Sequence, residues 1–216
     1  MVAPQTTRLP ASSDAVERIL AAAEALFAEH GFDAVSMNVI AEAAGVSKAN
    51  VFHHFTSKND LYLAVLRNAC RDATQHLDDL GNDQQALAAR LPQFARAHLG
   101  NLLEHGQVAR LMLRELLSDN PRHGQELAEQ VSGEKFSRFV AILRAGQHAG
   151  ELRADIDPAM VATMLIGANV FFFESREALR HFPDVTFTQQ PERYSTMLAD
   201  ILLHGILPPD SATTRN

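Results

Sequence analysis

Apolar side chains recur along most of the chain at intervals of three and four residues. The first clear run holds Val16, Ile19, Ala23 and Phe27, a spacing that places side chains on one stripe of a helix. Alternating runs of β-branched residues, which are typical of half-buried strands, are scarce. The pattern therefore predicts an all-α fold.

The first part of the chain carries clear start and stop signals for short helices. Ser13 or Asp14 can cap a first helix, and Gly31 is placed to end it. Ser36 then opens a second helix, and Gly45 is expected to end that one. These signals predict two helices separated by a short connection.

A third short helix follows the turn at Gly45, with Ser47 as its cap. Val51 and Phe55 are four residues apart, so both point to the core. The side chains that this arrangement turns outward are Lys48, Ala49, Phe52 and His53. An outward face of this kind predicts a binding partner.

Later turn signals divide the remainder into longer helices. A fourth helix starts at Ser57 with a capping-box pattern and is expected to run to about Leu80, before Gly81. Pro92 is expected to kink or restart the helix after it. The other predicted helices span residues 84–104, 106–118, 121–149, 158–181 and 191–206.

Charge changes this picture only locally. The 216-residue chain has a formal net charge of −7, and residues 1–58 carry four Lys or Arg against six Asp or Glu. Nonspecific binding of a polyanion by the whole surface is therefore disfavoured. A nucleic-acid contact would have to come from a small patch.

Cysteine content and hydropathy indicate a cytoplasmic protein. The single cysteine, Cys70, excludes an internal disulfide framework and is consistent with a reducing compartment. Residues 1–13 contain no apolar run typical of a signal peptide. The most apolar stretch, residues 162–173, is shorter than the roughly 20 residues needed to cross a bilayer. No membrane association is expected.

The second and third predicted helices, joined by a turn that contains Gly45, form a helix-turn-helix pattern. In such motifs the second helix lies in the major groove of DNA, which is about 12 Å wide and admits one helix. The outward residues of the third helix would then meet base edges. The expected partner is double-stranded DNA.

At this point the sequence resembles a known family. Residues 14–62, with the run "ILAAAEALFAEHGFDAVSMNVIAEAAGVSKANVFHHFTSKNDLY", are similar to the DNA-binding domain of the TetR family of bacterial transcriptional regulators. The resemblance implies a three-helix DNA-binding domain at 14–60 and a larger helical domain at 61–207 for effector binding and dimerisation. A flexible arm at 1–13 and a flexible tail at 208–216 complete the expected organisation.

The resemblance also implies which residues lie at or near DNA. Ser36 and Lys58 would contact phosphates. A cation in the first turn of a helix, such as Lys58, opposes the helix dipole unless an anion lies nearby, and a phosphate would supply that anion. The whole candidate set is Ser36, Ser47, Lys48, Ala49, Asn50, Phe52, His53, His54 and Lys58.

Two of these residues depart from the family pattern, and some have simpler interpretations. Phe52 stands where tyrosine is usual, so apolar contact with a sugar or a thymine methyl would replace a hydroxyl contact. Ala49 stands where glycine is common and limits the approach of the backbone. Phe52 could instead belong to the core, and His54 could be partly buried under the domain.

The small number of cations in the N-terminal part favours a homodimer, because two copies double the contacts and read two half-sites. The last two predicted helices, 158–181 and 191–206, carry apolar stripes suited to a four-helix interface. The alternative is that these helices pack only within one subunit.

The middle helices hold more large apolar residues than one stripe per helix requires, so some of them could line a cavity for a small-molecule effector. The resemblance implies an effector that shifts the spacing of the two DNA-binding units. The candidate effector-binding residues are His98, Leu102, Arg110, Leu113, Arg114, Phe139, Asn169 and Phe172. A family member that binds DNA or a partner without any ligand is the alternative.

Other classes of function have weaker signals. The sequence lacks a phosphate-binding glycine loop, a zinc-protease helix motif and a nucleophile elbow, so we do not expect an enzyme. His98 and His105 could share one helix face, but no tight cluster of metal ligands is apparent. No metal and no cofactor are predicted. The function expected is a repressor of palindromic operators that a small molecule releases.

Overall fold

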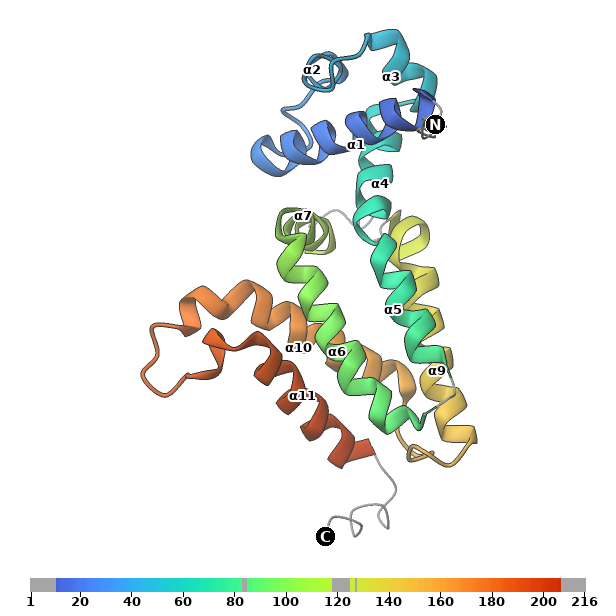
Figure 1. The fold of residues 1–216 in the computed structure, drawn as a ribbon, viewed down its shortest axis with the longest axis vertical. Helices are drawn as coiled ribbons and strands as arrows, with labels where there is room; N and C mark the ends of the chain where they lie inside the picture. Colours follow the sequence, from blue (N-terminus) through green and yellow to red (C-terminus); the bar gives the residue numbers. More distant parts are fainter. Residues whose placement is uncertain (1–10, 83–84, 118–124, 127, 207–216) are drawn as a thin grey trace, which may run out of the picture. The chain divides into compact units, whose positions relative to one another are not determined.

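The computed structural model describes residues 11–82, 85–117, 125–126 and 128–206 (Figure 1). Every regular element in these ranges is a helix, which confirms the all-α prediction. The chain forms two compact units. The N-terminal unit comprises residues 1–69 and 107–131, and the C-terminal unit comprises residues 70–106 and 132–216.

In the described part of the N-terminal unit, four α-helices are followed, much later in the chain, by α7. Their bounds are α1 Ala11–His30, α2 Met37–Ala43, α3 Lys48–His54, α4 Lys58–Ala69 and α7 Gly106–Leu116. A short π-helix, η1, spans Ala128–Ser132 at the end of the unit. Side chains with no exposed surface form its core, namely Ile19, Ala23, Phe27, Ile40, Val51 and Leu61.

The predicted start and stop signals of the short helices are confirmed. The Ser36 hydroxyl accepts a hydrogen bond from the Val39 amide at 3.3 Å, and the Ser47 hydroxyl accepts one from the Asn50 amide at 3.1 Å. Gly45 has a φ of +64°, which places it in the left-handed region that favours glycine. These three residues fix the ends of α2 and the start of α3.

The start of α1 differs from the prediction. The helix begins at Ala11, so Ser13 and Asp14 lie inside it rather than at its cap. Serine and aspartate are tolerated within a first turn, and an acidic residue there favours the positive end of the helix dipole.

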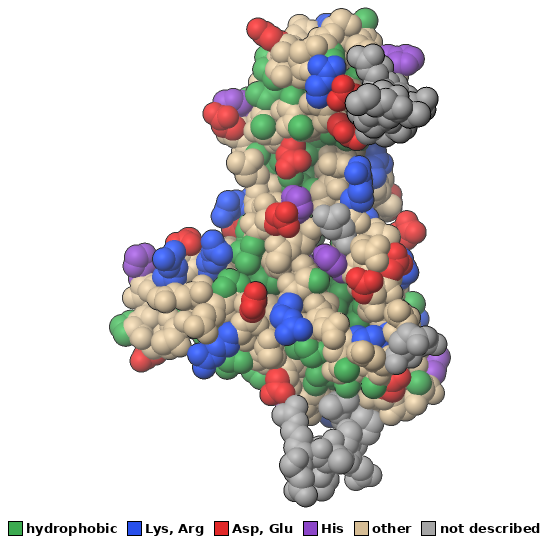
Figure 2. Space-filling model, viewed as in Figure 1, with side chains coloured by type: hydrophobic (Ala, Val, Ile, Leu, Met, Phe, Trp, Pro, Cys, Tyr) green, Lys and Arg blue, Asp and Glu red, His purple; other side chains and the backbone are tan. Residues whose placement is uncertain are grey.

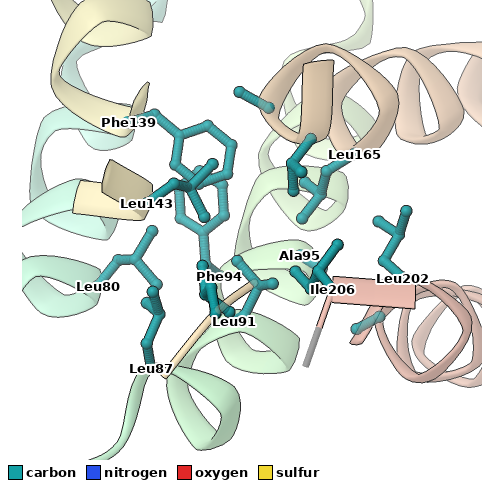
Figure 3. Close-up of a cluster of buried hydrophobic side chains, with 14 of the residues drawn as sticks. Leu80, Leu87, Leu91, Phe94, Ala95, Phe139, Leu143, Leu165, Leu202 and Ile206 are labelled. Carbon is teal, nitrogen blue, oxygen red and sulfur yellow. The ribbon is translucent and has the colours of Figure 1, made fainter. Parts of the chain in front are cut away.

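Among the described residues of the C-terminal unit there are five α-helices and one short 3-10 turn. Their bounds are α5 Arg71–Gly81, α6 Leu87–Glu104, α9 Gly133–His148, α10 Pro158–Leu179, η2 Phe187–Gln189 and α11 Pro191–Ile206. Helix α6 contacts α5, α10 and α11 and so lies at the centre of the unit. Figure 3 shows the core that results, with Phe94 of α6 directed toward Phe139 of α9.

Two predicted helices are corrected. The segment after Ser57 is not one helix to Leu80, because it is interrupted at Cys70, where ψ is 6°. Residues 67–76 contain no Leu, Val, Ile or Phe, so no continuous apolar stripe holds the two halves in one line.

The predicted helix at 121–149 is likewise not a single α-helix in its described part. The π-helical turn η1 precedes α9, which begins at Gly133. Residues 121–124 lie outside the described residues. Conversely, α6 is continuous through Pro92, where a kink or restart was expected.

Candidate nucleic-acid interface and ligand site

The outer face of α3 is exposed, as the four-residue spacing of Val51 and Phe55 predicts. Val51 has no exposed surface and Phe55 is 7% exposed, so both belong to the core. Lys48, Ala49 and His53 are exposed on the opposite side. The helix therefore presents a short polar face whose orientation is set by two buried anchors.

Phe52 lies on this exposed face and not in the core. Its side chain is 44% exposed, and the Lys48 ammonium group lies 5.8 Å from the centre of its ring. An aromatic ring beside a cation offers both an apolar surface and a positive charge. These are the groups that contact a thymine methyl and a guanine edge or phosphate.

The remaining polar candidates on α2 and α3 are partly committed to local structure. The hydroxyl groups of Ser36 and Ser47 cap helices, although both residues are exposed. Asn50 is half-buried, and its Oδ1 has no hydrogen-bond partner among the described residues. His54 is half-buried, with its ring centre 4.9 Å from that of His53.

Lys58 makes contacts that the sequence did not indicate. Its ammonium group donates to the carbonyl oxygen of Phe32 at 2.8 Å and to that of Asp33 at 3.4 Å. It also lies 4.2 Å from the centre of the Phe32 ring. The side chain therefore ties the start of α4 to the loop that precedes α2.

Basic side chains of the described residues are not gathered into one broad surface on the face of the molecule in Figure 2, where basic and acidic side chains are interspersed. This distribution agrees with the formal net charge of −7. Any contact with DNA would be local, as on the face of α3.

The candidate effector residues fall into both units. Arg110, Leu113 and Arg114 belong to α7 of the N-terminal unit. The other five belong to the C-terminal unit, namely His98, Leu102, Phe139, Asn169 and Phe172. The structure therefore does not assign these eight residues to one cavity.

Among the α7 candidates, Arg114 lines a cavity of about 400 Å³ within the N-terminal unit. Arg110 is exposed and Leu113 is half-buried. The same cavity is lined by Tyr62 and Glu115, which the sequence analysis did not single out. The Tyr62 hydroxyl donates to a Glu115 carboxylate oxygen at 2.9 Å, and burial, followed by this carboxylate, raises the pKa of Tyr62.

In the C-terminal unit the structure brings His98 and Asn169 together. The Asn169 amide nitrogen donates to the Ala95 carbonyl oxygen at 2.9 Å and lies 3.0 Å from His98 Nδ1. Asn169 has no exposed surface, and its Oδ1 has no hydrogen-bond partner among the described residues. A buried acceptor without a partner is costly, so this atom is a natural contact for a donor on a ligand.

The environment of His98 keeps its imidazole neutral. Burial, with a smaller contribution from His76, lowers the pKa of His98 to about 4. A neutral ring can accept from Asn169 at Nδ1 and donate from Nε2. The ring also stacks against Phe94, with the ring centres 6.2 Å apart.

Of the other three candidates in this unit, the two phenylalanines lie in aromatic pairs and Leu102 is half-buried. Phe139 is 4.6 Å from Phe94 between ring centres. Phe172 stacks on Tyr194 at 4.1 Å with an interplanar angle of 19°. Tyr194, which the sequence analysis did not propose for a ligand site, donates to the Ala168 carbonyl oxygen at 2.7 Å.

Two observations bear on the alternative functions of a metal sensor and an enzyme. In the part of the chain that the structure describes, no three His, Cys, Asp or Glu side chains are grouped to hold a metal ion. Cys70 is half-buried, and burial raises the pKa of its thiol, which disfavours the reactive thiolate.

The last two helices expose large apolar side chains. The most exposed on α10 are Met160 (61%), Met164 (54%) and Phe171 (66%), and on α11 they are Met197 (48%) and Ile201 (67%). By length and composition α10, with 22 residues, could also cross a membrane, so the shorter stretch considered from the sequence underestimates this helix. One such helix is weak evidence for a membrane span, because a packed helix of a globular protein has the same properties.

Comparison with known proteins identifies relatives of both parts of the chain. Residues 19–65 match the family described as "Bacterial regulatory proteins, tetR family", and residues 81–181 match "Tetracyclin repressor-like, C-terminal domain". The HTH-type transcriptional regulator RutR of Escherichia coli K12 is 33% identical over 147 residues, covering 68% of each chain.

Another relative and a solved structure extend the comparison. The regulator UidR of Escherichia coli K12 is 27% identical over 159 residues, which cover 69% of this chain and 74% of UidR. The SmeT–triclosan complex has a TM-score of 0.70 at 24% identity and covers 90% of this chain and 92% of SmeT. SmeT is the repressor of a multidrug efflux pump of Stenotrophomonas maltophilia.

Proposed function

Since the chain belongs to the TetR family of bacterial regulatory proteins, we propose that this transcriptional regulator is a repressor that binds a palindromic operator as a homodimer. The observation that carries the proposal is the face of α3, where Lys48, Phe52 and His53 are exposed opposite two buried anchors. Such a face fits the major groove and offers donors and an apolar surface to base edges.

The operator is found by selecting bound fragments from random DNA. The selected sites are expected to contain two inverted half-sites whose centres are about one helical turn, 34–36 Å, or a small multiple of it apart. Selected sites without an inverted repeat would contradict the palindromic operator.

The role of Lys48 is tested on the selected operator. Lys48→Ala is expected to cost about 1–3 kcal/mol for the preferred base at one position of each half-site, because a base contact discriminates between bases. The measurement is competition binding with operators altered at single positions. Arg144→Ala, which removes an exposed cation of α9, is the control. An equal loss for Lys48→Ala on random DNA would refute base readout.

A small-molecule effector in the C-terminal unit is the second part of the proposal. Its support is the pair His98 and Asn169, which presents a neutral imidazole beside a buried carbonyl oxygen without a partner. Phe94 supplies an aromatic surface next to the ring. The solved structure of a SmeT–triclosan complex has this fold, so a small molecule bound to a protein of this fold has a precedent.

An effector needs only to favour the conformation that does not bind DNA, by about 1–3 kcal/mol. A panel of metabolites screened by thermal unfolding would find it, because a ligand at 100 times its Kd stabilises the folded state by about 2.7 kcal/mol. The hit is expected to release the operator, and Asn169→Leu is expected to abolish that release. If no compound changes the midpoint of unfolding, the ligand-independent alternative, a regulator that binds only DNA or a protein partner, is favoured.

A transcriptional regulator binds chromosomal DNA, which in bacteria lies in the cytosol, so we propose a cytosolic location. The exposed apolar residues of α10 and α11 are then assigned to the homodimer interface rather than to a membrane. This assignment agrees with the amphipathic character of α11, whose other face is buried at Ser195, Ala199 and Leu202.

A further inference from the structure

A groove of about 930 Å³ lies between α6 and the segment formed by η2 and the start of α11, within the C-terminal unit. The large apolar residues of its lining are Leu99 and Leu103, both from α6, and of these Leu103 is half-buried whereas Leu99 is only 1% exposed. Neither His98 nor Asn169 lines it. The groove is therefore separate from the proposed effector pair.

A buried hydroxyl group without a partner lines this groove. Ser195 of α11 has no exposed surface, and its Oγ makes no hydrogen bond to the described residues. A buried polar group left unpaired destabilises the fold. A ligand that accepts a hydrogen bond from Ser195 would offset this destabilisation.

The start of α11 adds backbone donors at the same place. The helix begins at Pro191 and is 16 residues long. Its first intrahelical cap bond runs from the Tyr194 amide to the Gln190 carbonyl oxygen at 3.1 Å. The amide groups of Glu192 and Arg193 precede that bond and have no acceptor within the helix, so the helix start favours an anion.

Side-chain charge points to the same class of ligand. Arg96 of α6 and Arg193 of α11 line the groove, both are exposed, and neither makes an ion pair with another described residue. Glu192 is the one carboxylate among the described lining residues. The groove thus has a positive balance in a chain whose formal net charge is −7.

We propose that this groove binds an amphipathic organic anion, a carboxylate or phosphate carried on an apolar body. Arg96, Arg193 and the Ser195 hydroxyl contact the anionic group, and the apolar body lies along Ala97 and Leu103, which are partly exposed. The neutral environment of His98 and Asn169 suits a different ligand, so the two sites take different chemical classes.

The experiment is isothermal titration calorimetry of the full chain with three probes of equal chain length. Nonanoate and octyl phosphate, which both carry an eight-carbon alkyl tail, are expected to bind, and whichever binds more tightly identifies the preferred anionic group. Octyltrimethylammonium is not expected to bind, because its charge has the same sign as the two arginines. Arg96→Gln and Arg193→Gln are each expected to weaken the binding of the preferred anion about tenfold, and Ser195→Ala a few-fold.

Matched controls separate this groove from other surfaces. Arg144→Gln removes an exposed cation of the same unit and is expected to leave anion binding unchanged, and so is Asn169→Leu at the other site. The proposal is overturned by equal binding of the cationic probe, by no saturable binding of either anion, or by equal effects of Arg96→Gln, Arg193→Gln and Arg144→Gln. It does not depend on operator binding, so its failure and that of the proposed repressor function are separate results.

Discussion

Within the N-terminal unit, Lys58 makes hydrogen bonds that no sequence motif predicts. Its two hydrogen-bond acceptors are backbone carbonyl oxygens 25 and 26 residues earlier in the chain. An ammonium group has three donors, so one remains for a phosphate. A lysine at the start of a helix could be predicted as an anion contact, whereas its contacts with the Phe32 loop required the folded chain.

Lys58→Ala is expected to have two effects. In the absence of DNA, the free energy of unfolding should fall by about 1–2 kcal/mol, because two carbonyl oxygens lose a charged donor. With DNA, the slope of log K against log salt should become flatter by roughly 0.9, the contribution of one phosphate contact. Urea denaturation and salt-dependent operator binding measure the two effects.

Lys48→Ala is the control for stability, since Lys48 makes no hydrogen bond to the described residues that would hold another segment. An unchanged free energy of unfolding in Lys58→Ala would show that the carbonyl contacts contribute nothing. An unchanged salt slope would instead remove the phosphate role.

His98 is expected to make the stability of the protein depend on pH. Its pKa is about 4 in the folded state and about 6.5 in an unfolded chain. Between these values the unfolded state binds the proton and the folded state does not. The contribution is therefore fully present above pH 6.5 and is lost as the pH falls toward 4, at no more than about 1.4 kcal/mol per pH unit.

His98→Gln should reduce this slope, because glutamine can accept from Asn169 but does not titrate. Denaturant unfolding measured at several pH values between 4 and 7 tests the expectation, with the exposed His148→Gln as the control. A slope that is the same in His98→Gln and in the unaltered protein would count against a neutral, half-buried His98.

At the scale of elements, the sequence predicted most helices and many of their ends. The caps at Ser36 and Ser47, the turn at Gly45 and the prolines at the starts of α10 and α11 are local signals, and local signals can be read without a fold. The break at Cys70 and the π-helical turn η1 were not predicted. The absence of large aliphatic residues from 67–76 is a local signal for the break, and Gly133 is a poor helix former just after η1. That η1 forms a π-helical turn is decided by packing.

Gly146 and Gly100, which both lie within helices, are a matched pair for testing packing. A Cβ placed on Gly146 of α9 would lie 2.5 Å from Leu87 Cδ2 and 3.4 Å from Leu152, whereas one on Gly100 of α6 would meet nothing within 4 Å. Gly146→Ala is expected to lower the free energy of unfolding by about 1–2 kcal/mol through overpacking. Gly100→Ala should raise it by about 0.5–1 kcal/mol through helix propensity.

Thermal unfolding of the two variants gives the comparison. Because both changes add the same methyl group inside a helix, any difference in sign comes from the surroundings. Two stabilised variants would mean that Leu87 moves aside without cost and that α6 and α9 do not require the close approach.

At the scale of the whole molecule, the sequence identified the family and predicted which side of α3 is exposed, but it could not bring together the candidate ligand-binding residues. Asn169 meets the Ala95 carbonyl oxygen across 74 positions of sequence. The eight candidate effector residues were chosen by residue type, and the structure divides them between two units. Which helices meet is determined by packing over long separations, and no local pattern contains that information.

The proposed homodimer makes a prediction at this scale. Phe171→Asp and Ile201→Asp each place a charge on side chains of α10 and α11 that are 66% and 67% exposed in one subunit. Either change is expected to shift the protein to monomers and to reduce operator affinity, because burying an unpaired charge in an apolar interface is costly. Sedimentation equilibrium measures the first effect.

Phe182→Asp is the control, since Phe182 is also exposed, at 58%, but lies outside both helices. A dimer that persists in Phe171→Asp and Ile201→Asp would place the interface elsewhere. A dimer lost only in Phe182→Asp would place it at the loop between α10 and η2.

The route of the chain has a mechanical consequence. The polypeptide passes between the two units three times, after residues 69, 106 and 131. A chain truncated after residue 69 would therefore lack α7, which belongs to the N-terminal unit, and the Tyr62 hydroxyl would lose its acceptor on Glu115. A force that a bound ligand produces in the C-terminal unit would therefore reach the N-terminal unit through three covalent connections rather than one.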